Sequence, residues 1–269
     1  MSPTVEALLA KLSIRDLAIL DDLTQLRLLS TRQIQRLHFP VAEGHHLTGG
    51  GATKASWRVL TRLERDGLIA HLEGRIGGTR QGSQGFVWQL AAAGERLQRR
   101  RRGSGTRRRY LEPNRLYLEH RTAVNDLVVQ LRELHQRGAI ELLTVEAEPD
   151  CWRPYTGPHG IAQTLKPDLY VVIARGDFEN HWFIEIDLAT EHLPQIVTKA
   201  KAYRAHASTG AEQRRLGIYP AVLWLTTNRA RAAAMTAALK TDPSLPKGMF
   251  TVIPTDEADL FLLGTGASP

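Results

Sequence analysis

Three acidic side chains in the second half of the chain are spaced so that they could share a site. Asp168 precedes an apolar run at residues 169–174, and Glu185 and Asp187 interrupt a second run at residues 182–188. Both runs are typical of buried strands. Residues two apart on a strand point to the same face, so Glu185 and Asp187 share one.

A turn between these runs would bring the third carboxylate to the other two. Gly176 and Asp177 supply turn chemistry, and a hairpin places the start of its first strand beside the end of its second. Asp168 is therefore expected to approach Glu185 and Asp187. Clustered carboxylates repel one another unless a cation or a proton lies among them. The pattern indicates a site for a hard cation, with these three residues as candidate metal ligands.

This strand, turn, strand and helix pattern resembles the PD-(D/E)XK nuclease superfamily. Asp168 stands for the aspartate of "PD" and Glu185 for the second acidic residue, but Asp187 occupies the lysine position. The nearest substitutes are Lys199 and Lys201 in the following helix. The resemblance implies Mg²⁺-assisted attack of water on a phosphodiester, with Asp168, Glu185 and Lys199 as candidate catalytic residues.

Other interpretations of these residues stay open. The carboxylates could be a vestigial site, or could pair with Lys199, Lys201 and Arg204 in a structural cluster. Glu191 could bind at the site or cap the following helix, and His120 could act as a general base, bind phosphate or be structural. No zinc-type histidine spacing, GxSxG motif or nucleophilic cysteine context competes with this site.

The length and composition of the chain limit the classes of protein to which it can belong. The 269 residues suffice for one large or two modest domains, and 23% charged with 42% apolar residues is ordinary for a soluble globular protein. A lone cysteine, Cys151, excludes an internal disulfide and fits a reducing cytoplasm. The N-terminus lacks a signal-peptide pattern, and no apolar run approaches the roughly 20 residues that cross a bilayer. We expect a cytoplasmic protein that does not bind membranes.

Positive charge is concentrated in one segment. Residues 51–115 hold fifteen Lys and Arg against five Asp and Glu, a balance of +10, so the rest of this +7 chain sums to −3. Such a distribution is expected where one face meets a polyanion. Seven arginines fall within residues 98–110, and we favour contact with the phosphate backbone over an inert hinge for this linker.

The first part of the chain predicts three helices and two strands. Apolar periodicity favours helices at 14–29, 31–38 and 52–66, the second capped by Ser30 with Gln33 and the third ended by Gly67. Strands are expected at 68–72 and 86–90. The segment RVLTRLERDGLIAHLEGR resembles the recognition helix and first wing strand of winged helix-turn-helix domains. The resemblance implies that the third helix enters the major groove of double-stranded DNA.

The expected DNA contacts follow from that resemblance and from the linker. Most should be to phosphates, since these outnumber base contacts in such interfaces. Lys54, Arg58, Arg62 and Arg65 form a basic stripe on the third helix, and a solvated helix face is the simpler alternative for it. The candidate residues are Lys54, Trp57, Arg58 and Arg62 on the helix, Arg75 and Arg80 on the wing, and Arg107 and Arg108 in the linker.

The predicted organisation has three parts: a winged helix-turn-helix domain at 1–98, an Arg-rich linker at 99–112 and a PD-(D/E)XK-like domain at 113–269. In the last, helices at 114–137 and 228–240 and strands at 140–147, 221–227 and 249–253 accompany the hairpin. That order predicts an α/β sandwich with a mixed sheet. The fold class is therefore α+β in the first part and α/β in the second.

Three segments together resemble the replication-relaxation family. They are LEHRTAVNDLVVQL, KPDLYVVI and FIEIDLATEHLPQIVTKAKAY. The resemblance implies a DNA-binding protein needed for replication and relaxation of a plasmid or other mobile element, and leaves open whether it cleaves DNA. We expect a nuclease-like domain that has lost activity, with an Mg²⁺-dependent nickase or a winged-helix transcriptional regulator as alternatives. A second copy of the chain and replication or relaxosome proteins remain open as further partners.

Overall fold

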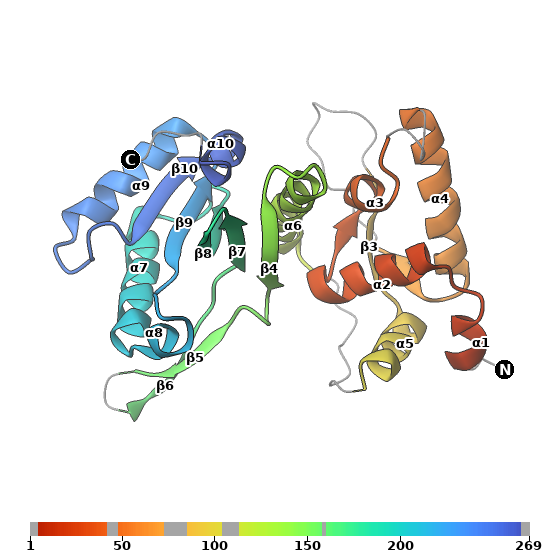
Figure 1. Cartoon of the computed structure of the whole chain (residues 1–269), viewed down its shortest axis with the longest axis horizontal. Helices are drawn as coiled ribbons and strands as arrows, with labels where there is room; N and C mark the ends of the chain where they lie inside the picture. The colour runs from red at the N-terminus through yellow and green to blue at the C-terminus, as the bar shows by residue number, and fades with distance from the viewer. Residues whose placement is uncertain (1–4, 42–47, 73–84, 104–112, 158–159, 265–269) are drawn as a thin grey trace. The chain divides into compact units, whose positions relative to one another are not determined.

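The computed structural model describes residues 5–41, 48–72, 85–103, 113–157 and 160–264. The chain divides into two compact units, Met1–Glu133 and Leu134–Pro269. Helices and strands are mixed, as predicted, and the larger sheet combines parallel with antiparallel strands (Figure 1). No helix in these described segments is both long and apolar enough to cross a membrane.

The first unit packs helices around a small sheet. Its three strands have the order β1-β3-β2, and both pairs are antiparallel. The elements are α1 (Val5–Leu9), α2 (Ile14–Leu26), β1 (Leu29–Ser30), α3 (Thr31–His38), α4 (Gly49–Arg65), β2 (Ile69–His71), β3 (Val87–Leu90), α5 (Ala92–Arg102) and α6 (Arg115–Gln136) as far as Glu133.

Local capping explains where these helices begin and end. The predicted capping box of α3 is confirmed: Gln33 N–H donates to Ser30 Oγ at 3.1 Å, and Ser30 N–H donates to Gln33 Oε1 at 2.8 Å. The predicted extension of α2 to residue 29 is wrong, because Arg27 adopts a φ of 69° and the chain turns into β1. α4 begins before the predicted residue 52, because Thr48 Oγ1 accepts the N–H of Gly51.

Helix α6 joins the first unit through buried polar contacts. The amide of Asn125, which is fully buried, donates to the backbone carbonyls of Leu26 and Leu28. Arg132 donates to the Asp22 carboxylate at 2.5 Å. These contacts assign most of α6 to the first compact unit, and the division between the two units falls within this helix.

The second unit is built on a five-stranded sheet with the order β10-β9-β8-β7-β4. β8 pairs antiparallel with β7 and parallel with β9, and β9 pairs parallel with β10. A separate hairpin, β5–β6, was not predicted. The elements are β4 (Glu141–Ala147), β5 (Arg153–Thr156), β6 (Ala162–Leu165), β7 (Leu169–Arg175), β8 (Phe178–Asp187), α7 (Leu193–Ser208), α8 (Ala211–Leu216), β9 (Ala221–Thr226), α9 (Arg229–Thr241), β10 (Phe250–Pro254) and α10 (Ala258–Leu262).

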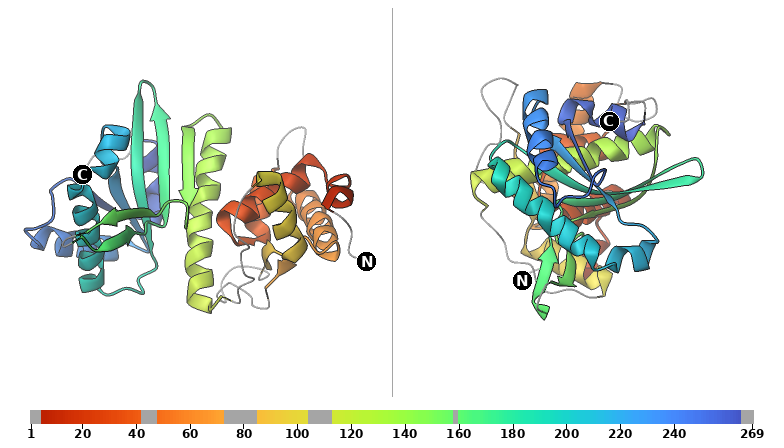
Figure 2. Two further views of the ribbon diagram at one scale, coloured as in Figure 1. Left: turned by 90° about the horizontal axis from the view of Figure 1, so that it is seen from below. Right: turned by 90° about the vertical axis from the view of Figure 1, so that its left-hand side faces the viewer.

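Helices α7 and α9 cover one face of this sheet (Figure 2). Phe183 and Trp224 from the sheet pack with Tyr203 of α7 and Met235 of α9 in one buried cluster. Side chains alternate along β8, so Glu185 and Asp187 lie on the same covered face as Phe183. The fold therefore places the acidic residues under two helices.

The close contact of α5 with Leu68, in the turn between α4 and β2, gives a test of the first unit. A Cβ at Gly94 would lie 2.0 Å from the backbone oxygen of Leu68, which already accepts the N–H of Ala91. We expect Gly94→Ala to lower the free energy of unfolding by about 1–3 kcal/mol or more, because backbone must move. Gly50→Ala is the matched control, since a Cβ there meets open space in α4. Urea unfolding measures both, and equal stability of the two variants would contradict the packing.

Candidate functional site

The β7–β8 hairpin brings Asp168 beside Glu185, as predicted. Leu169 pairs with Ile184. Asp168, the residue before Leu169, therefore lies opposite Glu185, the residue after Ile184. Asp168 is buried, and its Oδ2 accepts the backbone N–H of Ile186 at 2.8 Å. That hydrogen bond fixes the carboxylate at the end of the sheet next to Glu185.

Helix α7 supplies two partners to the Glu185 carboxylate. Tyr203 donates its hydroxyl proton to Oε1 at 2.5 Å, and Lys199 Nζ lies 2.6 Å from Oε2. Lys199 and Tyr203 are four residues apart, so both face the sheet from the same side of the helix. Glu185 is only 1% exposed. The candidate lysine and the two candidate acids are thus gathered in one cluster.

Burial is the largest single influence on the pKa values of Glu185, Lys199 and Tyr203. It raises the pKa of Glu185 to about 8, with Asp168 adding to the rise and Lys199 opposing it. Burial would lower the pKa of Lys199, but the neighbouring carboxylates of Glu185 and Asp168 outweigh it and raise that pKa. Burial and Glu185 raise the pKa of the Tyr203 hydroxyl well above its usual value. The tyrosine therefore acts as a hydrogen-bond donor.

Asp187, at the position of the motif lysine, has partners of its own. Its Oδ2 accepts from the Thr226 hydroxyl at 2.7 Å and from Arg231 Nε at 2.9 Å, and its Oδ1 accepts from the same guanidinium at 3.1 Å. Burial would raise the pKa of Asp187, but the hydrogen bonds from Arg231 and Thr226 outweigh it and lower that pKa. Asp187 is engaged away from Glu185.

The arrangement does not fit a magnesium ion as it stands. Among the described residues, no group of three or more His, Cys, Asp or Glu side chains is placed to hold a metal. The three predicted ligands, Asp168, Glu185 and Asp187, are buried and accept hydrogen bonds from protein groups. A metal would have to displace these partners.

The other residues considered from the sequence lie elsewhere. Lys201 pairs with Asp242 at 2.8 Å, and Arg204 donates to a backbone carbonyl, so neither contributes to the structural cluster proposed for them. α7 begins at Leu193 after His192, which makes the suggestion that Glu191 caps this helix wrong. His120 lies on α6 in the first unit.

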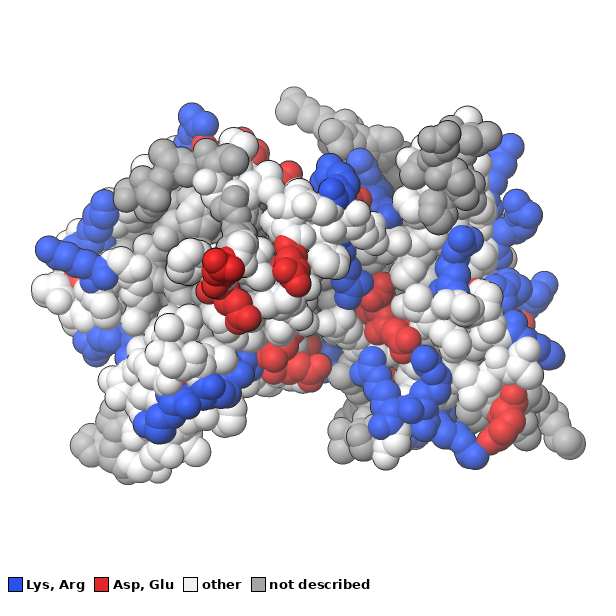
Figure 3. Space-filling view, viewed as in Figure 1, with Lys and Arg blue, Asp and Glu red and all other residues white. Residues whose placement is uncertain are grey.

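A second candidate site is the exposed face of α4. Lys54 and Arg58 are exposed, and Trp57 between them is 46% exposed. Thr61 and Arg65 continue the same side of the helix at spacings of three and four. Lys and Arg side chains lie along the outer side of α4, at the right of the view (Figure 3). The face therefore presents cations around one aromatic ring.

The remaining predicted DNA contacts have different surroundings. Arg62 donates to the buried carboxylate of Asp16 at 2.6 Å, which fastens α4 to α2. Arg75, Arg80, Arg107 and Arg108 lie outside the described residues.

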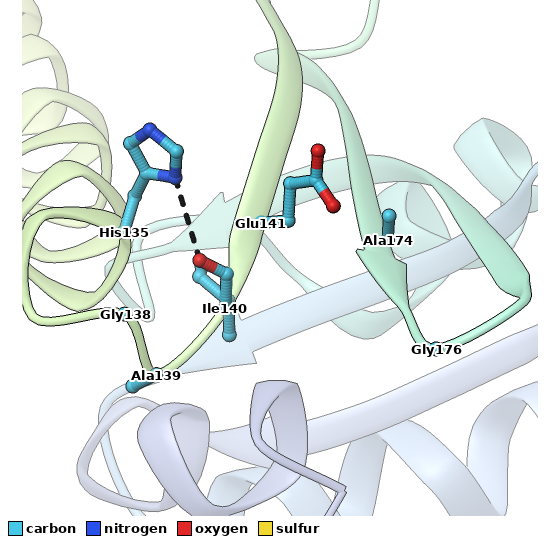
Figure 4. Close-up of a pocket in the computed structure, with 7 residues that line it drawn as sticks. All are labelled: His135, Gly138, Ala139, Ile140, Glu141, Ala174 and Gly176. Carbon is cyan, nitrogen blue, oxygen red and sulfur yellow. Dashed lines mark hydrogen bonds between the residues drawn. The ribbon is translucent and has the colours of Figure 1, made fainter.

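A hollow of about 480 Å³ lies at the other end of the hairpin sheet (Figure 4). Its lining includes His135 from the end of α6, Glu141 from β4 and Ala174 from β7. His135 Nδ1 accepts the N–H of Leu142 at 3.2 Å. Because Asp168 precedes β7 and Ala174 is near its end, this hollow is not part of the carboxylate cluster.

Sequence analysis missed three groups that complete these sites. Tyr203 was recoverable, because it lies four residues after Lys199 on the predicted helix. Thr226 and Arg231 were not, because their contact with Asp187 depends on strand order and on the docking of α9.

Comparison with known proteins identifies a family for most of the chain. The family model described as replication-relaxation matches residues 20–222. No curated protein and no solved structure matches the chain.

The protonation of Glu185 predicts a pH dependence of stability. Its folded pKa of about 8 exceeds the ordinary 4.5, so its protonated form stabilises the fold fully below pH 4.5 and this contribution is lost as pH rises through 8. Over that window the free energy of unfolding should fall by up to about 1.4 kcal/mol per pH unit.

Glu185→Gln should flatten that slope, because the amide does not titrate. Glu141→Gln is the control, since it changes an exposed glutamate of the same sheet. Urea unfolding at a series of pH values measures the slope. An unchanged slope in Glu185→Gln would show that another group is responsible.

Proposed function

The chain belongs to the replication-relaxation family, and from this we propose that it binds double-stranded DNA of a plasmid or integrative mobile element. It acts there in replication, in DNA relaxation or in transfer. Its second unit is a nuclease-like scaffold that no longer cleaves DNA. The observation that carries the proposal is the exposed face of α4.

Charge and exposure on α4 support DNA binding. Lys54, Arg58 and Arg65 project from one side of the helix. Glu64, the residue before Arg65, is paired with His71 instead, with its Oε1 2.6 Å from His71 Nδ1. Within the described residues, Lys54 and Arg58 form no ion pair. Exposed cations without carboxylate partners can neutralise phosphates and release their counterions. A merely solvated face would be expected to mix charges of both signs.

The arrangement of the first unit supports a winged helix-turn-helix mode of binding. Helices α2, α3 and α4 precede strands β2 and β3, and β1 completes the small sheet. In that mode α4 enters the major groove, and its capped start and buried side position it against α2 and α3. Arg62 then has a positioning role through Asp16, and its contact with phosphate remains a proposal.

The surroundings of the carboxylates support a scaffold without activity. Glu185 is buried under α7 with Tyr203 at one carboxylate oxygen and Lys199 at the other, so neither oxygen is open to a cation. Asp187 replaces the motif lysine and is neutralised by Arg231. A buried, satisfied cluster of this kind stabilises the fold rather than a reacting phosphate.

DNA nicking is the second candidate activity, and Lys199 is the observation that favours it. Its amino group reaches the acidic residue of the motif from the helix, at 2.6 Å from Glu185. A lysine relocated in this way would place its charge beside the two acids, as the missing motif lysine would.

The DNA-binding proposal predicts that Lys54→Ala and Arg58→Ala each weaken binding to duplex DNA. Each variant should also reduce the slope of log affinity against log salt concentration by about 0.9, because one fewer counterion is released. Lys240→Ala removes an exposed lysine from α9 and is the control. Fluorescence anisotropy over a salt series gives both quantities. Affinities unaffected by the α4 variants would refute this interface.

The scaffold proposal predicts that supercoiled plasmid stays intact. Purified protein should give the same amount of open circles with Mg²⁺, with Mn²⁺ and with EDTA. Metal-dependent nicking would favour the second candidate if Glu185→Ala and Lys199→Ala abolish it. Lys201→Ala is the matched control for Lys199→Ala, because Lys201 lies two residues later and pairs with Asp242.

A further inference from the structure

One aromatic side chain of the first unit is exposed beside Lys54 and Arg58, two cations that form no ion pair with any described residue. Trp57 is 46% exposed, although tryptophan usually buries most of its surface. Lys54 lies one turn before it on α4, and Arg58, the next residue along the helix, is also exposed. An indole in this position contributes little to the core of the unit.

The indole is nevertheless held rigidly from one side. Its ring stacks on Phe86 with centroids 5.7 Å apart and an interplanar angle of 29°. The edge contact with Trp88 has centroids 6.4 Å apart. The centroid of the Phe86 ring is in turn 4.8 Å from that of His71. Glu64 Oε1 lies 2.6 Å from His71 Nδ1 and holds that ring in place. Three elements, α4, β2 and the start of β3, therefore hold one face of Trp57 and leave the rest of the ring accessible.

A flat, rigid aromatic ring recognises the face of a base better than its edge. In paired duplex DNA the base faces are stacked on one another, and the grooves present only edges with hydrogen-bond donors and acceptors. The indole has one donor and no acceptor, so it can read little of that pattern. Base faces become available where strands are unpaired, and stacking there tolerates any sequence.

We propose that Trp57, held by Phe86, is a stacking platform for an unpaired base, with Lys54 and Arg58 binding the adjacent phosphates. The protein would then bind DNA containing a short unpaired region in preference to fully paired DNA of the same sequence. This inference rests on the proposed DNA-binding function and adds the state of the DNA that is recognised.

The test uses two fluorescent duplexes of one length, one fully paired and one with a short central run of mismatches that carries 2-aminopurine. We expect the full chain to bind the mismatched duplex roughly tenfold or more tightly at equal salt, as stacking of one base contributes. The fluorescence of 2-aminopurine should be quenched on binding. Trp57→Ala should bind both duplexes equally, whereas Trp57→Phe should retain most of the preference.

Control variants separate this proposal from the general one. Arg58→Ala should weaken binding to both duplexes by a similar factor, and circular dichroism melting establishes that Trp57→Ala is folded. Equal binding of both duplexes by the unaltered chain, or unchanged 2-aminopurine fluorescence, would overturn the stacking platform while leaving duplex binding intact. A preference that survives in a folded Trp57→Ala would overturn it as well. Absence of binding to either duplex would overturn the proposed function itself.

Discussion

The second unit depends on the burial of charge beneath two helices. A carboxylate removed from water costs several kcal/mol unless partners with good geometry replace the lost hydration. Strand β8 carries two such groups, and each obtains its partners from a different helix. Glu185 is satisfied by Lys199 and Tyr203 of α7, and Asp187 by Arg231 of α9. These contacts fix the position of both helices along the strand, which apolar packing alone specifies less sharply.

The basic side chains of the first unit have two kinds of surroundings. Some form ion pairs between helices. Arg62 pairs with buried Asp16 and Arg132 pairs with Asp22, which joins helices α4 and α6 to α2. Others on α4, such as Lys54 and Arg58, face outward and have no carboxylate partner among the described residues. Sequence periodicity groups Arg62 with Lys54 and Arg58 in one basic stripe on α4. Only the packing separates those that hold the fold from those that face solvent.

Much of the secondary structure and part of the candidate site could be predicted from the sequence. Strong periodicity and explicit caps gave α3, α9 and the β7–β8 hairpin, and the alternation of strand side chains correctly placed Glu185 and Asp187 on one face. The short strand β1 was missed because its pairing with the distant strand β3 defines it. Strands β5 and β6 were missed because each has four residues, largely exposed, and so lacks a buried apolar run. Likewise, the partner of Asp187 could not be predicted, because Arg231 approaches it only after β9 and α9 have docked.

The register of the β7–β8 hairpin has a consequence for folding as well as for the site. A slip of one residue would turn Glu185 and Asp187 to the opposite face, into the places now held by Ile184 and Ile186 and beside the buried side chains of Leu169 and Leu223. No cation from a helix would reach them there, and two buried acidic side chains without partners would make that misaligned sheet unstable. The acidic pair thus favours the observed alignment of the strands over a shifted one, a structural role that does not depend on any reaction at the site.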